Sequence, residues 1–192
     1  RMYYQVGADI AFTPYSEAAE SALGGEWIPP IVAFAELPGV MRATRVGEYD
    51  ARMEVSGGRS ASLRFLAVDR ADFAPVAWFR RDFAGESLGS LMNRLAATPD
   101  SILVSQSFLA QHLLKVGDGI PLWVTLDAGF RVQSQFTIAG VYSLFPTTEE
   151  AENAVIGNMD YLALLAGATF PHDIWLRVEE GADSKTLLKS VE

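Results

Sequence analysis

Apolar residues recur at every second position along several stretches of the chain, which is the period of a half-buried β-strand. The clearest case is the set Ile120, Leu122, Val124 and Leu126. The same reasoning predicts strands over residues 3–12, 40–55, 61–68, 102–104, 120–126, 132–142, 154–159 and 174–178. Gly57-Gly58 separates two of these stretches, and this pattern predicts a β-hairpin.

Helical spacing is clearest between residues 108 and 116, where apolar side chains repeat three and four positions apart. The members of this stripe are Phe108, Leu109, His112, Leu113 and Val116. Ser105 or Ser107 can cap the start of this helix, and Gly117 is predicted to end it with a positive φ. Further helices are expected over residues 17–23, 88–95 and 161–165, and from 183 onward.

The composition describes a folded globular protein without cysteine chemistry. Hydrophobic residues occupy 49% of the 192 positions, which suffices for a sizeable core. The lack of cysteine excludes disulfides, thiolate metal sites and a cysteine nucleophile. The net charge of −9 argues against nonspecific nucleic-acid binding and against an anionic lipid surface as a direct partner, because both require clustered cations.

No run of about 18 or more apolar residues occurs, so the sequence predicts no membrane-spanning segment of its own. The chain begins at Arg1 without an apolar signal segment and ends inside a helical pattern. We therefore expect both ends to be cuts through a longer polypeptide.

One motif suggests an enzyme. Gly85-Glu86-Ser87-Leu88-Gly89 matches the G-x-S-x-G turn that presents the nucleophilic serine of α/β-hydrolases, and His112 and His172 follow downstream. However, residues 78–82 before the motif do not read as the buried strand that such a turn requires. The simpler interpretation is that Ser87 caps the helix that starts at Leu88.

Metal and nucleotide sites are not indicated. His112 lies on the apolar stripe and reads as a core histidine, and His172-Asp173 reads as a loop histidine beside a capping carboxylate. The acidic run Glu149, Glu150 and Glu152 lacks the spacing of a calcium loop. Residues 115–119 lack the G-x-x-x-x-G-K-[ST] frame of a phosphate loop, so no nucleotide site is visible. We therefore predict no catalytic, cofactor-binding or metal-ligating residue.

Two short sequence motifs in the middle of the chain resemble those of a known family. Residues 115–120, KVGDGI, are followed by residues 136–141, FTIAGV, and this order resembles the extracytoplasmic domain of FtsX/MacB-like ABC transporter permeases. Looser agreement at residues 37–40, 65–69, 175–178 and 181–183 extends the resemblance over nearly the whole chain.

The resemblance implies an α+β fold with two lobes. A membrane-proximal βαβ-type lobe, the porter-like lobe, would comprise residues 1–69 and 172–192, and an inserted sabre-like lobe would comprise residues 70–171. Because the chain of such a permease leaves and re-enters the membrane, we expect residues 3–12 to pair or pack with residues 174–178. Hinges are expected near residues 69–72 and 170–173.

The function that the resemblance implies is not enzymatic. The domain would lie outside the cell membrane as part of a permease, and the permease would form a dimer and work with a cytoplasmic ABC ATPase. It would transmit ATP-driven motion to a peptide, a lipoprotein or an envelope protein. Two alternatives stay open: a small serine hydrolase built on Ser87, and a stand-alone ligand-binding module.

Overall fold

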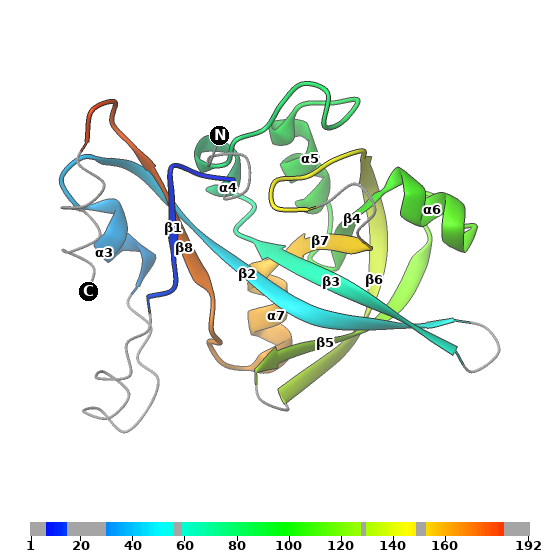
Figure 1. Cartoon of the computed structure of the whole chain (residues 1–192). Helices are drawn as coiled ribbons and strands as arrows, with labels where there is room; N and C mark the ends of the chain where they lie inside the picture. The colour runs from blue at the N-terminus through cyan, green and yellow to red at the C-terminus, as the bar shows by residue number, and fades with distance from the viewer. Residues whose placement is uncertain (1–6, 15–29, 56–58, 128–129, 149–152, 183–192) are drawn as a thin grey trace.

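The computed structural model describes residues 7–14, 30–55, 59–127, 130–148 and 153–182 (Figure 1). Its strands are β1 (Ile10–Phe12), β2 (Val40–Val55), β3 (Arg59–Val68), β4 (Ser101–Ser105), β5 (Gly119–Asp127), β6 (Phe130–Tyr142), β7 (Ala154–Asn158) and β8 (Asp173–Val178). Its helices are α3 (Ile31–Ala35), α4 (Phe73–Val76), α5 (Leu88–Leu95), α6 (Gln106–His112) and α7 (Met159–Ala166). None of these helices is long and apolar enough to cross a membrane.

The strands form one mixed sheet in the order β1-β8-β2-β3-β7-β4-β6-β5. β2 is 16 residues long and contacts three other strands. One of its edges pairs with β3, whereas the other pairs first with β8 over Val40–Val46 and then with β5 over Asp50–Met53. The pairing with β5 closes the strands from β2 to β5 into a barrel, and β8 and β1 extend the sheet beyond it (Figure 1).

Alternation along the strands fills the interior of this barrel with apolar side chains. Burying one large apolar side chain is worth roughly 1.5–3 kcal/mol, so this cluster is a main source of stability. Its fully buried members include Phe65, Ile102, Val104, Phe108, Leu122, Val124, Ile138, Val155 and Leu162. Leu162 comes from α7, which therefore contributes to the same core.

The outer face of β3, β7 and β4 is covered by helices. Leu66, Leu103 and Ile156 share a second buried cluster with Phe73 of α4 and Leu91 of α5. α3 covers a third, smaller cluster around β1 and β8, where the Phe34 ring meets the Phe12 ring edge-on at 5.4 Å.

Most of the predicted elements are confirmed, including the long-range pairing. β1 runs antiparallel to β8 with Ile10 opposite Leu176, although the chain over residues 7–9 is bent rather than extended. β2 and β3 form the predicted hairpin, which ends with Val55 opposite Arg59. The turn at Gly57-Gly58, residues 3–6 and the helices expected over 17–23 and from 183 lie outside the described residues.

The helix predicted over residues 108–116 is wrong in its extent. α6 ends at His112, Leu113 takes a left-handed φ of 54°, and the backbone N–H of Leu114 donates to the carbonyl of Leu109 at 3.0 Å. This is a Schellman-type ending, and it turns Leu113 and Val116 out to solvent. Gly117 does have the predicted positive φ, 96°, but it lies in the turn before β5 rather than at the helix end.

The mixed α/β class is confirmed, whereas the division into two lobes stays a prediction. Strands β2 and β3 belong to the expected porter-like range, and β4 to β7 belong to the expected sabre-like range. Both sets lie in the same sheet.

Candidate functional site

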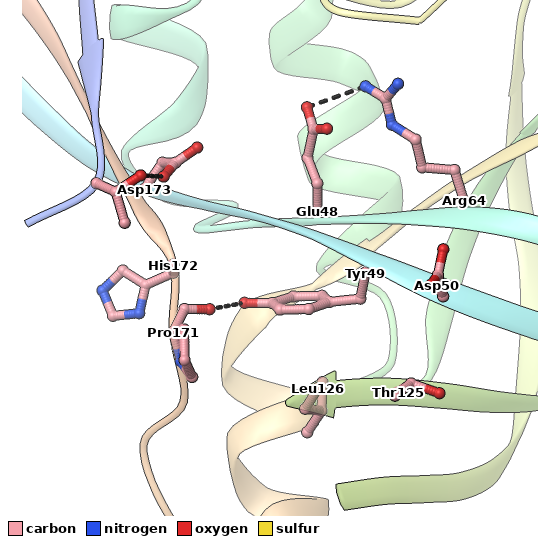
Figure 2. A pocket seen from close by; sticks show the side chains of 10 residues that line it. Glu48, Tyr49, Asp50, Arg64, Thr125, Leu126, Pro171, His172 and Asp173 are labelled. Atoms are coloured by element: carbon pink, nitrogen blue, oxygen red, sulfur yellow. Dashed lines mark hydrogen bonds and ion pairs between the residues drawn. The ribbon is translucent and has the colours of Figure 1, made fainter. Parts of the chain in front are cut away.

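A gap in the pairing along one edge of β2 creates the candidate site. The β8 pairing ends at Val46, and the β5 pairing begins at Asp50. A cavity of about 480 Å³ lies beside this gap, within the size range of small-ligand sites (Figure 2). It is lined by Thr13, Glu48, Tyr49, Asp50, Arg64, Thr125, Leu126, Pro171, His172 and Asp173.

Tyr49 spans the gap and ties β2 to the segment that leads into β8. Its hydroxyl donates to the carbonyl of Pro171 at 2.6 Å, and its ring meets the Phe170 ring edge-on at 5.4 Å. The ring lies across Gly47, because a Cβ at Gly47 would stand 2.0 Å from the Tyr49 hydroxyl. Gly47 is therefore required for this close approach rather than for an unusual backbone angle.

Arg45 makes a second tie from β2, close to the same cavity. Its Nε and Nη2 both donate to Oδ2 of Asp69, at 3.0 and 2.8 Å, and Nη2 also donates to Oδ1 of Asp160 at 2.9 Å. The Asp69 side chain is only 10% exposed, so salt screens this charge-assisted pair less than it would screen a surface ion pair. It fixes the end of β3 and the start of α7 to β2.

His172 follows Pro171 in the chain and lies close enough to Arg45 and Asp69 to feel their charges. Its Nδ1 is 2.9 Å from the carbonyl of Phe170. Burial lowers the pKa of His172 below its ordinary value of 6.5; nearby Arg45 also lowers this pKa, whereas the Phe170 carbonyl, Asp173 and Asp69 act in the opposite direction. The net effect favours the neutral ring in the folded protein.

Four other polar side chains of the cavity, Glu48, Arg64, Thr13 and Asp173, form two hydrogen-bonded pairs. Arg64 donates to Glu48 at 2.9 Å and to the carbonyl of Thr147 at 2.8 Å, and Thr13 donates to Asp173 at 2.6 Å. Figure 2 shows the Glu48–Arg64 pair and Asp173 around Tyr49. These contacts join β2 to β3, β3 to the segment after β6, and the segment after β1 to β8, so the arrangement is suited to holding strands together.

The structure does not bring the candidate hydrolase residues together. Ser87 accepts a hydrogen bond from the backbone N–H of Ser90 at 3.2 Å and caps α5, as its simpler interpretation predicted. The cavity beside it is lined mainly by small and apolar residues, and neither histidine is among its described lining residues. His112 instead packs against Phe108 at the end of α6, with ring centroids 4.6 Å apart and the ring planes tilted by 52°.

Metal binding finds no support in the described part of the chain, where no three His, Asp or Glu side chains come together as a metal site would require. Glu149, Glu150 and Glu152 lie outside the described residues.

The ties made by Tyr49 and Arg45 escaped the sequence analysis. Residues two positions apart in a strand share one face of the sheet, so an aromatic ring can lie over a glycine two positions before it. Gly47 and Tyr49 fit this arrangement. No local pattern links Arg45 to Asp69 or Asp160, which lie 24 and 115 positions further along the chain.

A scan against protein-family models and a search of curated proteins found no match. Solved structures do match. The extracellular domain of the noncanonical ABC-type transporter YknZ from Gram-positive bacteria is 13% identical, with a TM-score of 0.57 over 94% of this chain and 86% of that one. The periplasmic region of MacB from Actinobacillus actinomycetemcomitans is 9% identical, with a TM-score of 0.54 over 94% of this chain and 78% of that one. The structure thus confirms the resemblance found in the sequence, because the chain has the fold of these extracytoplasmic transporter domains.

Proposed function

We propose that the chain is an extracytoplasmic domain of an ABC transporter permease and that it performs no chemistry itself. In this role it transmits motion from membrane helices, driven by a cytoplasmic ABC ATPase, to a peptide, lipoprotein or envelope protein outside the cell. The permease works as a dimer.

One observation carries this proposal beyond likeness of fold. β1 and β8 lie side by side although more than 160 positions separate them, with Phe12 opposite Ile174. The first and the last described strands therefore share one sheet, on the side of the molecule away from α6 (Figure 1). This arrangement suits a domain inserted between two membrane helices, because a displacement of either helix would reach the same sheet.

The predicted lobes, 1–69 with 172–192 and 70–171, are part of the proposal. Their junctions, near residues 69–72 and 170–173, coincide with the two ties from β2. Arg45 contacts Asp69 at the first junction, and Tyr49 contacts Pro171 at the second. Movement between the lobes would have to break the contacts of Arg45 with Asp160 and of Tyr49 with Pro171, together with the β2–β5 and β3–β7 pairings. We propose that these side-chain contacts add to the resistance that the strand pairings give the domain.

The location can be tested directly because the chain has no cysteine. Lys115→Cys would place a single exposed thiol in this domain of the full-length protein, within a version cleared of other cysteines. A membrane-impermeant maleimide should label it in intact cells, and Phe73→Cys, which is fully buried, should label only after denaturation. Labelling of Lys115→Cys only after lysis would contradict an extracytoplasmic location.

Function is tested in the full-length permease with its ATPase. Removing residues 7–182 should leave basal ATP hydrolysis measurable while abolishing transport or activation of the extracellular partner. If the complete gene product is secreted and is absent from the membrane fraction, a stand-alone ligand-binding module explains the chain better. Ester hydrolysis that disappears in Ser87→Ala would instead support the hydrolase.

A further inference from the structure

We propose that the cavity beside Tyr49 and the exposed Trp123 next to it form one binding site for an uncharged oligosaccharide. One sugar ring stacks on the Trp123 indole, and the next places its hydroxyl groups in the cavity, against Asp50 and Thr125. This ligand site goes beyond the proposed transporter role. It can be tested on the chain alone, so its failure would leave that role untouched.

The pairing of β2 with β5 places Trp123 beside the cavity. Asp50 lies opposite Thr125, and both line the cavity (Figure 2). The next outward-facing pair is Arg52 and Trp123, because the residues between them in each strand fill the barrel interior. Residues two positions apart in a strand share a face and lie about 7 Å apart. The Trp123 side chain therefore continues the wall of the cavity along the outer face of the barrel.

The side chains that flank Trp123 on this face are polar. Trp123 is 37% exposed. Arg52 lies opposite it on β2 and Gln133 lies opposite it on β6, and both side chains are exposed. A protein partner is disfavoured, because the centre of a protein interface is depleted of charged residues. The arrangement instead suits a ligand that is polar around one apolar surface.

Charges of both signs around the site disfavour an ionic ligand. Arg52 lies opposite Trp123, and Arg131 lies opposite Thr125, so a cation above the indole would be repelled by neighbouring guanidinium groups. Asp50 and Glu48 line the cavity, so an anion there would be repelled by carboxylates. The ligand that meets neither repulsion is uncharged.

A sugar chain matches both parts of the site. A face of a pyranose ring presents C–H groups, which pack on the electron-rich face of an indole, and its hydroxyl groups both donate and accept hydrogen bonds. The exposed carboxylate of Asp50 makes no hydrogen bond or ion pair with the described residues. It can therefore accept hydrogen bonds from two neighbouring sugar hydroxyls, and Thr125 provides a hydroxyl on the opposite strand. A few convergent polar groups of this kind give a small-ligand site its specificity.

The experiment measures binding of tetrasaccharides to the full chain by isothermal titration calorimetry. Cellotetraose, maltotetraose and tetra-N-acetylchitotetraose are the uncharged probes, tetragalacturonic acid is the anionic probe, and fully deacetylated chitotetraose is the cationic probe. We expect an uncharged probe to bind more tightly than either charged one. Trp123→Ala removes the stacking surface and Asp50→Asn removes part of the acceptor, so each should weaken binding about tenfold.

Leu164→Ala and Asp72→Asn are the matched controls. Leu164 is a 73% exposed leucine on α7, and Asp72 is an exposed aspartate before α4 whose side chain does not cap that helix. Both variants should bind like the unmodified chain. The proposal is overturned if no uncharged probe binds, if a charged probe binds more tightly than every uncharged one, or if Trp123→Ala and Asp50→Asn bind as the controls do. Asp50→Asn keeps the shape of the side chain, so it decides the matter even if Trp123→Ala lowers the thermal midpoint.

Discussion

The Tyr49 hydroxyl donates a hydrogen bond to the carbonyl of Pro171 at 2.6 Å, across 122 positions of sequence. The contact bridges the point where β2 passes from β8 to β5, so it joins the barrel to the strands that extend beyond it. It depends on Gly47, which leaves the space that the ring occupies. One of the two side-chain contacts that we propose for the mechanical coupling of the domain therefore depends on a glycine, an aromatic ring and one backbone carbonyl.

The first prediction concerns the pair Gly47 and Tyr49. Tyr49→Phe removes only the hydroxyl and should lower the free energy of unfolding by about 1 kcal/mol. Gly47→Ala should cost more, because its Cβ would displace the ring. In a Tyr49→Ala background, however, the Gly47→Ala substitution should cost less. Urea unfolding of the single and double variants measures this coupling.

Tyr142→Phe is the control for this prediction. The Tyr142 hydroxyl also donates to a backbone carbonyl, that of Ala154, at 2.8 Å. It should show a similar loss of stability, but no coupling to Gly47. Strict additivity of Gly47→Ala and Tyr49→Ala would show that the two positions do not share space.

The second prediction is a pH dependence set by His172. Its pKa is lowered by burial in the folded protein, from an ordinary value of 6.5. Below about pH 6.5 the unfolded chain therefore takes up this proton more readily than the folded one, so the free energy of unfolding falls as the pH falls. Above that pH the contribution is fully present. Unfolding measured between pH 8 and pH 5 should show a weaker decline in His172→Gln, and an identical decline would contradict the assignment.

The sequence predicted most elements of the fold because the signals involved are local. The alternation of Ile120, Leu122, Val124 and Leu126 defines β5, and the hairpin between β2 and β3 follows from two glycines. The pairing of β1 with β8 was accessible only through the family resemblance, since nothing in either strand specifies the other. Ser87 was correctly interpreted as a helix cap because its surroundings do not fit a nucleophile.

What escaped prediction depends on non-local geometry. The barrel closes because β2 is long enough to pair with β8 and then with β5 along the same edge. The hydrophobic pattern of β2 does not indicate which strands pair with it. The predicted end of α6 was wrong because a leucine rarely adopts the left-handed conformation that ends a helix. We therefore expected the helix to continue to the next glycine, Gly117. The ties from Arg45 and Tyr49 exist only once the sheet has formed.

The third prediction separates helix capping from catalysis at Ser87. Ser87→Ala removes the acceptor for the Ser90 N–H, so the free energy of unfolding should fall by about 1 kcal/mol. Ser87→Asp should restore most of this loss, because aspartate is also a good cap. The unmodified chain and both variants should hydrolyse p-nitrophenyl acetate no faster than buffer alone. Failure of Ser87→Asp to restore stability would show that the hydroxyl serves another purpose.

The last prediction uses two backbone positions in the same turn. Leu113 has a φ of 54° and an almost fully exposed side chain, so it gains little from packing and bears the cost of a left-handed conformation. Replacing it by glycine or asparagine, which adopt that conformation more readily, should stabilise the chain by roughly 1 kcal/mol.

Gly117 has a φ of 96°, and a Cβ there would meet nothing within 4 Å. Gly117→Val should therefore destabilise the chain through backbone strain alone, by roughly 1–3 kcal/mol. The opposite signs of the two shifts in thermal midpoint test the backbone geometry of the turn, and a destabilising Leu113→Asn would show that the exposed leucine is held by contacts of its own.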